Sequence, residues 1–511
     1  MKKIITLLIL IFSVTVSSQT FEWLITPQIN FNSNPSLIGY PTTCDNNGNI
    51  YLAGFVDNVY NYGDIFGDVF YNKYSTSGVL LWSKTFTGKA QVYNMIADAA
   101  GNIYVAADYV QSMTIDSVTI STSAQGENEI ILKFDSNGTL LWYQEIADCS
   151  NFKSVAVDSN DFLYICYDNY NNSYVNKLDP NGNILLTITQ QHVNVGSSVS
   201  VDNEGNIYTA GACANSSAIY AGVSAPTTLS YNTYVAKYNS VGIFQWVKYI
   251  QDITCSDPQV KARTPDEVYF CSTLFGAYTF DNLVAEGPTN NGYDFFIAKL
   301  NSTGTFQWVR EVPGAGRAFI GKRNFITLDT VGNIYFAGSS SQNVNWGNNI
   351  TTTSTIYQDA LILKYNSNGT ILMAKTAGGA DTDRCDGVTV NNVGDIFVSG
   401  IARGSSTFET IQHSETSQTK FYPFLTKINF SDLKSTDFEI QTALIYPNPS
   451  SDSFSIANGN QYSKGEIYTA LGQKVKDFII ADATPISIKE LKKGTYFIKL
   501  DQIKTIKLIK N

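Results

Sequence analysis

Residues 98–107 read Asp-Ala-Ala-Gly-Asn-Ile-Tyr-Val-Ala-Ala, and related copies of this stretch recur along the chain. The copies begin at Asp45, Asp98, Asp158, Asp202, Arg263, Asp329 and Asn391. In each copy a polar turn sequence precedes a run of β-branched and aromatic residues, which is typical of a strand. The Gly at the fourth position of most copies supplies the positive φ that a tight turn requires. This self-similarity indicates a repeat architecture.

A second repeated segment alternates with the first. In it a Lys stands five residues before a turn Gly and a Trp usually follows four residues after that Gly, as in Lys133, Gly138 and Trp142. The Lys and Gly pairs are Lys73/Gly78, Lys133/Gly138, Lys177/Gly182, Lys237/Gly242, Lys299/Gly304 and Lys364/Gly369. Trp23 has no Lys segment before it, and Lys427 has no Trp strand after it. Counting from Trp23 gives seven complete cycles of Trp, Tyr and Lys.

The length of the repeat favours one architecture. The shortest repeat, from Tyr164 to Tyr208, has 44 residues, which suits a four-stranded propeller blade. Longer repeats carry inserts, such as 112–121 and 277–287, that we expect to form outer hairpins or long loops. No sustained 3.6-residue pattern occurs, so almost no helix is expected. The sequence therefore predicts an all-β chain with a seven-bladed β-propeller over residues 19–433, and a linear solenoid is the alternative.

The repeat also has a family resemblance. The pattern Asp-x-x-Gly-Asn-Ile-Tyr-x-Ala-Gly, followed by Lys-x-x-x-x-Gly-x-x-x-Trp, resembles the bacterial SBBP-type β-propeller repeat over residues 19–433. The Lys-to-Trp segment is also similar to quinoprotein propeller repeats. The resemblance implies a fold but not a function, because propellers host binding and catalysis alike.

The N-terminus has the pattern of an export signal. Lys2 and Lys3 precede an apolar run over 4–16, and the small residues Ser17 and Ser18 follow. This pattern predicts a secretory signal peptide over residues 1–18, and a buried N-terminal helix is the alternative. The apolar run has 13 residues, fewer than the ~20 that span a bilayer. We expect no transmembrane segment elsewhere in the chain.

The repeat stops after Lys427, and a different domain follows. A polar linker is expected over 434–442 and a small antiparallel β-sandwich over 443–511, where alternating apolar residues are separated by Gly turns. The charge also changes sign. Residues 461–511 hold ten Lys and five acidic residues, a net charge of +5, and because the whole chain has a net charge of −10, the rest of the chain carries −15. Such a shift marks a domain boundary.

Ordered motifs give this second domain a resemblance of its own. The motif residues are Tyr446, Pro447, Asn448, Pro449, Leu471, Gly472, Gln473, Gly494, Tyr496, Lys499, Lys507 and Lys510. In this order they resemble the type A C-terminal sorting domain of the type IX secretion system of Bacteroidota. The resemblance implies that the type IX secretion machinery is a partner, and that the chain crosses the outer membrane. It also implies that the sorting domain is then removed, leaving a product that is released or attached to the surface. An ordinary β-sandwich adhesion module is the alternative.

The seven cysteines are an odd number for an exported chain. Cys149 and Cys166 occupy the same places in one blade as Cys255 and Cys271 in another, on consecutive segments that should pair. We therefore predict the disulfides Cys149–Cys166 and Cys255–Cys271. Small buried thiols are the alternative. Cys44, Cys213 and Cys385 have no assigned partner.

Few residues suit a metal site. Only His192 and His413 are present, and no Cys-x-x-Cys spacing occurs, so a zinc site is not expected. Asp381, Asp383 and Asp386 are a candidate calcium site, because spaced carboxylates supply the oxygen ligands that calcium prefers. Ordinary turn residues are the alternative interpretation. No other cofactor is predicted.

Composition limits the function. A net charge of −10 opposes binding to nucleic acid. The repeats offer no singular catalytic constellation, so we expect a non-enzymatic cell-surface or secreted module that binds a surface glycan or a protein through blade-edge loops. A secreted enzyme, either a polysaccharide hydrolase or quinoprotein-like, with its site at the central channel is the alternative, and a structural coat component is a third.

Overall fold

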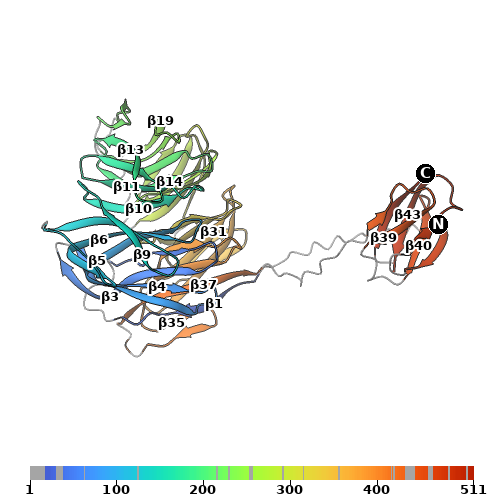
Figure 1. Ribbon diagram of the computed structural model, residues 1–511, viewed down its shortest axis with the longest axis horizontal. Helices are drawn as coiled ribbons and strands as arrows, with labels where there is room; N and C mark the ends of the chain where they lie inside the picture. Colours follow the sequence, from blue (N-terminus) through green and yellow to red (C-terminus); the bar gives the residue numbers. More distant parts are fainter. Residues whose placement is uncertain are drawn as a thin grey trace. The chain divides into compact units, whose positions relative to one another are not determined.

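The structure is a computed structural model with two compact units (Figure 1). It describes residues 18–29, 38–61, 64–123, 126–213, 217–227, 231–251, 257–289, 293–314, 316–354, 357–415, 417, 420–431, 444–457, 464–480, 484–501 and 504–511. The first unit is Gln19–Phe430, and the described part of the second is 444–511. The predicted linker and all but Ser18 of the predicted signal peptide lie outside the described residues. Every regular element in the described ranges is a strand, so the all-β prediction is confirmed.

The first unit is a succession of four-stranded antiparallel groups. The groups nearest the N-terminus are β2 (Thr42–Cys44), β3 (Ile50–Asn61), β4 (Asp64–Tyr74) and the first part of β5 (Leu80–Ala97), and then the second part of β5 with β6 (Ile103–Ile115), β8 (Glu127–Phe134) and β9 (Leu140–Glu145). The next groups are β10 (Asn151–Val157), β11 (Leu163–Asp168), β12 (Ser173–Leu178) and β13 (Ile184–Gln191); β14 (Val195–Val201), β15 (Ile207–Cys213), β18 (Asn232–Tyr238) and β19 (Phe244–Gln251); and β20 (Gln259–Thr264), β21 (Glu267–Leu274), β24 (Asp294–Leu300) and β25 (Phe306–Glu311). The last groups are β26 (Arg317–Ile320) and β27 (Ile326–Leu328) with β28 (Ile334–Ser341), β31 (Asp359–Tyr365) and β32 (Ile371–Gly379), and β33 (Arg384–Val390), β34 (Ile396–Arg403) and β37 (Phe421–Ser431) with β1 (Ser18–Ile25).

Short hairpins extend several of these groups. They are β7 (Val118–Ser121) on β6, β16 (Ile219–Tyr220) with β17 (Val223–Ser224), β22 (Ala277–Phe280) with β23 (Leu283–Glu286), β29 (Val344–Gly347) with β30 (Ile350–Thr352), and β35 (Ser406–Phe408) with β36 (Ile411–His413). Both inserts singled out in the sequence are hairpins, the first made by β6 and β7 and the second by β22 and β23.

The last group contains strands from both ends of the unit. β1 lies beside β37, the strand that carries Lys427 (Figure 1). The Thr426 hydroxyl donates to the Trp23 carbonyl across this pair at 2.7 Å. The pairing explains why Trp23 has no Lys segment before it and Lys427 no Trp strand after it. The N-terminal strand completes the group to which the final Lys strand belongs.

The innermost strands form a closed ring. β2 contacts β5, and contacts continue through β10, β14, β20, β27 and β33 back to β2. Apolar clusters fill the space between neighbouring groups; in one of them Tyr104 and Ile131 pack with Phe152 and Leu163. A ring of antiparallel four-stranded sheets around an axis is a β-propeller, so the predicted fold class is confirmed.

The second unit is a small sandwich of two sheets. One sheet is β38 (Leu444–Tyr446), β39 (Ser453–Ala457) and β42 (Ile486–Ser487), and the other is β41 (Lys474–Ile479), β40 (Lys464–Thr469), β43 (Gly494–Leu500) and β44 (Lys504–Lys510). Phe454 from the first sheet packs with Ile467, Ile498 and Leu508 from the second. This two-layer core is the sandwich expected from the alternating apolar pattern.

Candidate functional site at the mouth of the central channel

The repeated Asp, Tyr, Lys and Trp residues join one blade to the next. Lys133 Nζ lies 3.5 Å from Asp98 Oδ2 and 4.7 Å from the centre of the Tyr104 ring. It also donates to the Pro180 carbonyl of the following blade at 3.0 Å, and Trp142 Nε1 donates to the same carbonyl at 3.1 Å. The Lys133 and Asp98 side chains are only 6% and 1% exposed. The cluster is thus a buried ion pair that locks two blades.

The same contacts recur around the unit. The other Lys–Asp pairs are Lys73–Asp45, Lys177–Asp158 and Lys427–Asp395, at 3.6, 3.9 and 3.3 Å. Trp82, Trp246, Trp308 and Trp23 also donate to a carbonyl of the next blade's turn. The turn Gly fits beneath the Trp ring: at Gly304, where φ is +79°, a Cβ would stand 2.8 Å from Trp246 Cδ2. The most repetitive residues are therefore structural.

The candidate calcium site stays a prediction, and its three carboxylates have protein partners in this structure. Asp381 Oδ1 accepts from Arg403 Nη1 at 2.9 Å, and Asp386 Oδ1 accepts from Arg384 Nε at 2.6 Å. Asp383 accepts from the backbone N–H groups of Gly379 and Arg403, at 2.8 and 2.9 Å. Burial raises the pKa of Asp383 to about 7. These residues stabilise loops.

The predicted disulfide between Cys149 and Cys166 is not formed in this structure, in which both residues are free thiols. The strand register shows where the two residues lie. Cys166 pairs with Ser154 across β10 and β11, whereas Cys149 precedes β10. Burial raises the pKa of both thiols. Cys271 is buried in β21, and its predicted partner Cys255 lies outside the described residues.

The sorting motifs lie in the second unit, and one of them joins its two ends. Asn448, within Tyr446 to Pro449, donates to the Lys507 carbonyl at 2.7 Å and accepts from the Ile509 N–H at 2.9 Å. Leu471 is 98% exposed in the turn that contains Gly472 and Gln473. The remaining motif residues are Gly494, Tyr496 and Lys499 on β43 and Lys507 and Lys510 on β44. Tyr496 is buried, and Lys499 lies over the Tyr468 ring.

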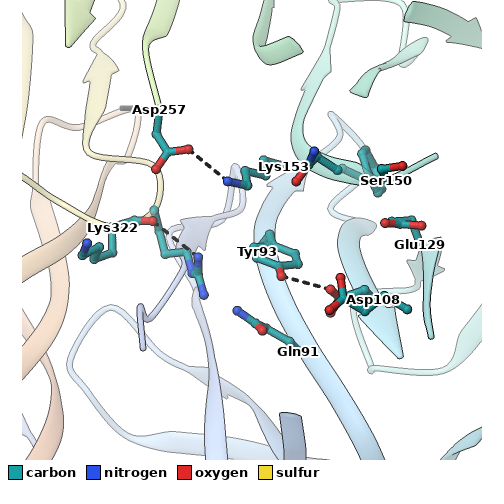
Figure 2. Close-up of a pocket in the computed structure, with 12 residues that line it drawn as sticks. Gln91, Tyr93, Asp108, Glu129, Ser150, Lys153, Asp257 and Lys322 are labelled. Atoms are coloured by element: carbon teal, nitrogen blue, oxygen red, sulfur yellow. Dashed lines mark hydrogen bonds and ion pairs between the residues drawn. The ribbon is translucent and has the colours of Figure 1, made fainter. Parts of the chain in front are cut away.

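A polar pocket of about 200 Å³ lies where the inner strands begin, at one mouth of the channel (Figure 2). Figure 2 shows Asp108 and Glu129 on one side, Asp257 and Lys322 on the other, and Tyr93 and Lys153 between them. The lining residues are Gln91, Tyr93, Asp108, Glu127, Glu129, Ser150, Asn151, Phe152, Lys153, Asp257, Lys322 and Arg323. They come from several blades, so the pocket depends on ring closure.

One side of this mouth pocket is basic. Lys153 Nζ lies 3.1 Å from Asp257 Oδ1, and the Arg323 guanidinium lies over the Tyr93 ring. Burial acts to raise the pKa of Asp257, but the nearby cations Lys153, Lys322 and Arg323 outweigh it and lower that pKa. Burial and the Arg384 charge lower the pKa of Lys322. This side carries three cations for one carboxylate.

The opposite side is acidic. Asp108 Oδ2 accepts from the Tyr93 hydroxyl at 2.9 Å. Glu129 is only 5% exposed. Burial, together with the charges of Glu127 and Asp168, raises its pKa to about 7. A buried carboxylate that titrates near neutrality at the edge of a cavity is typical of functional sites.

A second cavity of about 190 Å³ lies along the inner strands, with Lys261 as its one charged lining side chain. Thr43, Asn324, Thr327 and Thr389 are among its polar lining residues. Burial lowers the pKa of Lys261 to about 8. Neutral hydroxyl and amide groups do not compensate this ammonium as a carboxylate would.

Sequence reasoning did not identify the mouth pocket. Tyr93 and Lys153 stand five residues before the turn segments at Asp98 and Asp158, and Arg323 stands six residues before Asp329. The first two positions are aligned by the repeat and the third is one residue away, and they hold different residues. A position that has a fixed place in the repeat but a different residue in each copy is the signal that could have located the pocket.

Comparison with known families identifies the second unit. Residues 444–511 match the family of secretion system C-terminal sorting domains, which confirms the sorting domain predicted from the motifs. Such a domain directs secretion across the outer membrane to the cell surface or beyond. In the described ranges no helix is both long and apolar enough to cross a membrane.

No curated protein matches the chain. Among solved structures it is similar to a streptogramin B lyase at 13% identity and a TM-score of 0.40, over 80% of this chain and 98% of that one. It is similar to virginiamycin B lyase from Staphylococcus aureus at 11% identity and a TM-score of 0.41, over 80% and 99% of the two chains. For the Dos1 propeller the values are 7%, 0.40, 81% and 96%. Likeness at this level assigns no function, and the fold rests on the strand pairing.

Proposed function

We propose that this protein is an exported seven-bladed β-propeller that acts as a non-enzymatic binding module at the cell surface or in the medium. A signal peptide over 1–18 takes the chain to the periplasm, and the type IX secretion machinery recognises the sorting domain, which is then removed. The succession of strand groups and the closed ring support the blade number. The motifs support a repeat of the SBBP type in a protein from Bacteroidota.

The mouth pocket carries the binding part of this proposal. A concave polar site with converging charged groups is the usual form of a small-ligand site. Here the charged groups come from β6, β8, β10 and the segments before β20 and β27, so the ring of blades positions them. We therefore assign ligand binding to the channel mouth rather than to the blade-edge loops.

The test is ligand-induced thermal stabilisation of the full-length protein, with a panel of soluble polysaccharides and small polar molecules. A ligand at a hundred times its dissociation constant stabilises the folded state by about 2.7 kcal/mol. Lys322→Gln should abolish the shift, because Lys322 lines the pocket. Lys248→Gln is the matched control, since Lys248 forms a half-exposed ion pair with Asp281 at 2.9 Å outside the pocket.

Each outcome decides between functions. A shift that Lys322→Gln removes, without product, supports the binding module. A shift accompanied by a shortened polysaccharide would indicate a hydrolase, because two carboxyl groups such as Asp108 and Glu129 can divide acid and base roles. A shift that persists in Lys322→Gln, or no shift with any compound, would contradict binding at the mouth.

A further inference from the structure

We propose that the mouth pocket binds a small dipolar molecule with a carboxylate and an ammonium group, of the size of an amino acid or a dipeptide. The carboxylate would lie at Lys322 and Arg323 and the ammonium at Glu129 and Asp108. This inference rests on the proposed function, and it adds the chemical class of the ligand.

The basic side has capacity for an anion. Lys153 is paired with Asp257, but the Lys322 ammonium makes no hydrogen bond or direct ion pair with any residue in the described part of the chain. The Lys322 residue is exposed to solvent at the pocket, and desolvation together with the Arg384 charge lowers its pKa. A partly desolvated ammonium is stabilised by a carboxylate placed within hydrogen-bonding distance.

The acidic side of the pocket can bind a cationic group. The Glu129 side chain is nine-tenths buried and lines the pocket, and its carboxylate has a hydrogen bond from its own backbone N–H but no ion pair within the described ranges. Glu127, Asp108 and Asp168 add negative charge near it. A buried carboxylate without a cationic partner is costly, and an ammonium group would both neutralise it and donate to it.

The two sides together point to one molecule rather than two. The pocket holds about 200 Å³, which is below the ~300–1,000 Å³ of sites for drug-sized ligands. Opposite charges face each other across this small volume (Figure 2). A ligand with only an anionic group would satisfy Lys322 and leave Glu129 unpaired, and a simple cation would do the reverse.

The experiment is calorimetric titration of the full-length protein at pH 8 with dialanine, N-acetyl-dialanine, dialanine amide and galacturonate. We expect dialanine to bind at least tenfold more tightly than either blocked peptide. In Lys322→Gln the preference for the free carboxylate should disappear while the preference for the free amine remains. In Glu129→Gln the pattern should reverse, and Lys248→Gln should match the wild type.

The wild-type selectivity alone keeps the inference falsifiable if a variant fails to fold. Equal affinity for dialanine and its blocked forms would overturn it. If galacturonate binds more tightly than dialanine and Lys322→Gln weakens that binding, the dipolar ligand is wrong but the mouth remains the binding site. If no compound binds and the wider panel also gives no shift, both the ligand class and the proposed site fail.

Discussion

Lysines occupy two regions of the propeller and serve opposite purposes in them. At the blade junctions each repeated Lys has a buried Asp, a Tyr ring or a carbonyl of the next blade as its partner, as Lys133 does with Asp98, Tyr104 and Pro180. In the channel, Lys322 and Lys261 line cavities and have no carboxylate within ion-pair distance in the described part of the chain. The lysines at the blade junctions interact with groups of the fold, and the ammonium groups of the two cavity lysines remain available to a ligand.

The difference separates structure from function within one repeat. A contact that must be made at every blade junction requires the same residue in every blade. The residues that close the ring of blades are therefore repeated in the sequence. A ligand touches only some blades, and it touches each from a different angle. Residues that bind it can therefore stand at equivalent positions and differ in kind, as Tyr93 and Lys153 do.

The largest expected effect is at a blade junction. Lys133→Met should lower the free energy of unfolding by about 3–5 kcal/mol, because it leaves the Asp98 carboxylate buried without its cation. Urea denaturation followed by tryptophan fluorescence measures this loss. The control is Lys248→Met, at a half-exposed pair that should contribute at most ~1 kcal/mol. Equal losses in the two variants would remove the distinction between the junction and the surface.

Sequence predicted the propeller well because its strongest signal, the repeated Asp, Tyr, Lys and Trp, comes from residues that make the blade junctions. The sorting domain was equally clear, since its motifs include local turns such as the one at Leu471 and Gly472. The mouth pocket was not predictable, because Glu129 and Lys322 are nearly 200 residues apart and meet only after ring closure. Spacing also does not specify side-chain direction or competing partners, such as Arg403 for Asp381, so it could not show how the cysteine and calcium candidates are surrounded.

The next effect has the opposite sign and concerns Lys261. Its pKa falls from 10.5 to about 8 on folding, so the folded protein at pH 7 holds an ammonium that the unfolded chain solvates better. Lys261→Met should therefore raise the free energy of unfolding by about 2–3 kcal/mol at pH 7. The wild type gains stability as pH rises from about 8 to 10.5, so the difference should vanish above that range. Thermal unfolding of both proteins at pH 7, 9 and 10.5 measures it, and a constant difference would refute the cause.

A smaller gain is expected at Glu129. Its pKa rises from 4.5 to about 7 on folding, so the wild type loses stability as pH rises through this interval. Glu129→Gln should be more stable than the wild type by about 1–2 kcal/mol at pH 8 and equal to it near pH 4. Glu204→Gln, in an exposed turn, should follow the wild type at both values. Because the charges of Glu127 and Asp168 also act on Glu129, the difference in unfolding free energy between variant and wild type, measured by denaturant unfolding, is the relevant quantity.

The smallest expected effect on stability is that of Lys322→Gln, and it tests the difference between the lysines of the channel and those of the blade junctions. Lys322→Gln should change the free energy of unfolding by no more than ~0.5 kcal/mol, because Lys322 has no direct ion-pair partner in the described residues and its substitution leaves no buried carboxylate unpaired. The same denaturation experiment that detects Lys133→Met measures this. A loss of 2 kcal/mol or more would mean that Lys322 is a structural residue like the repeated lysines. Its availability to a ligand would then be wrong, since a cation that the fold already requires has no spare interaction to offer.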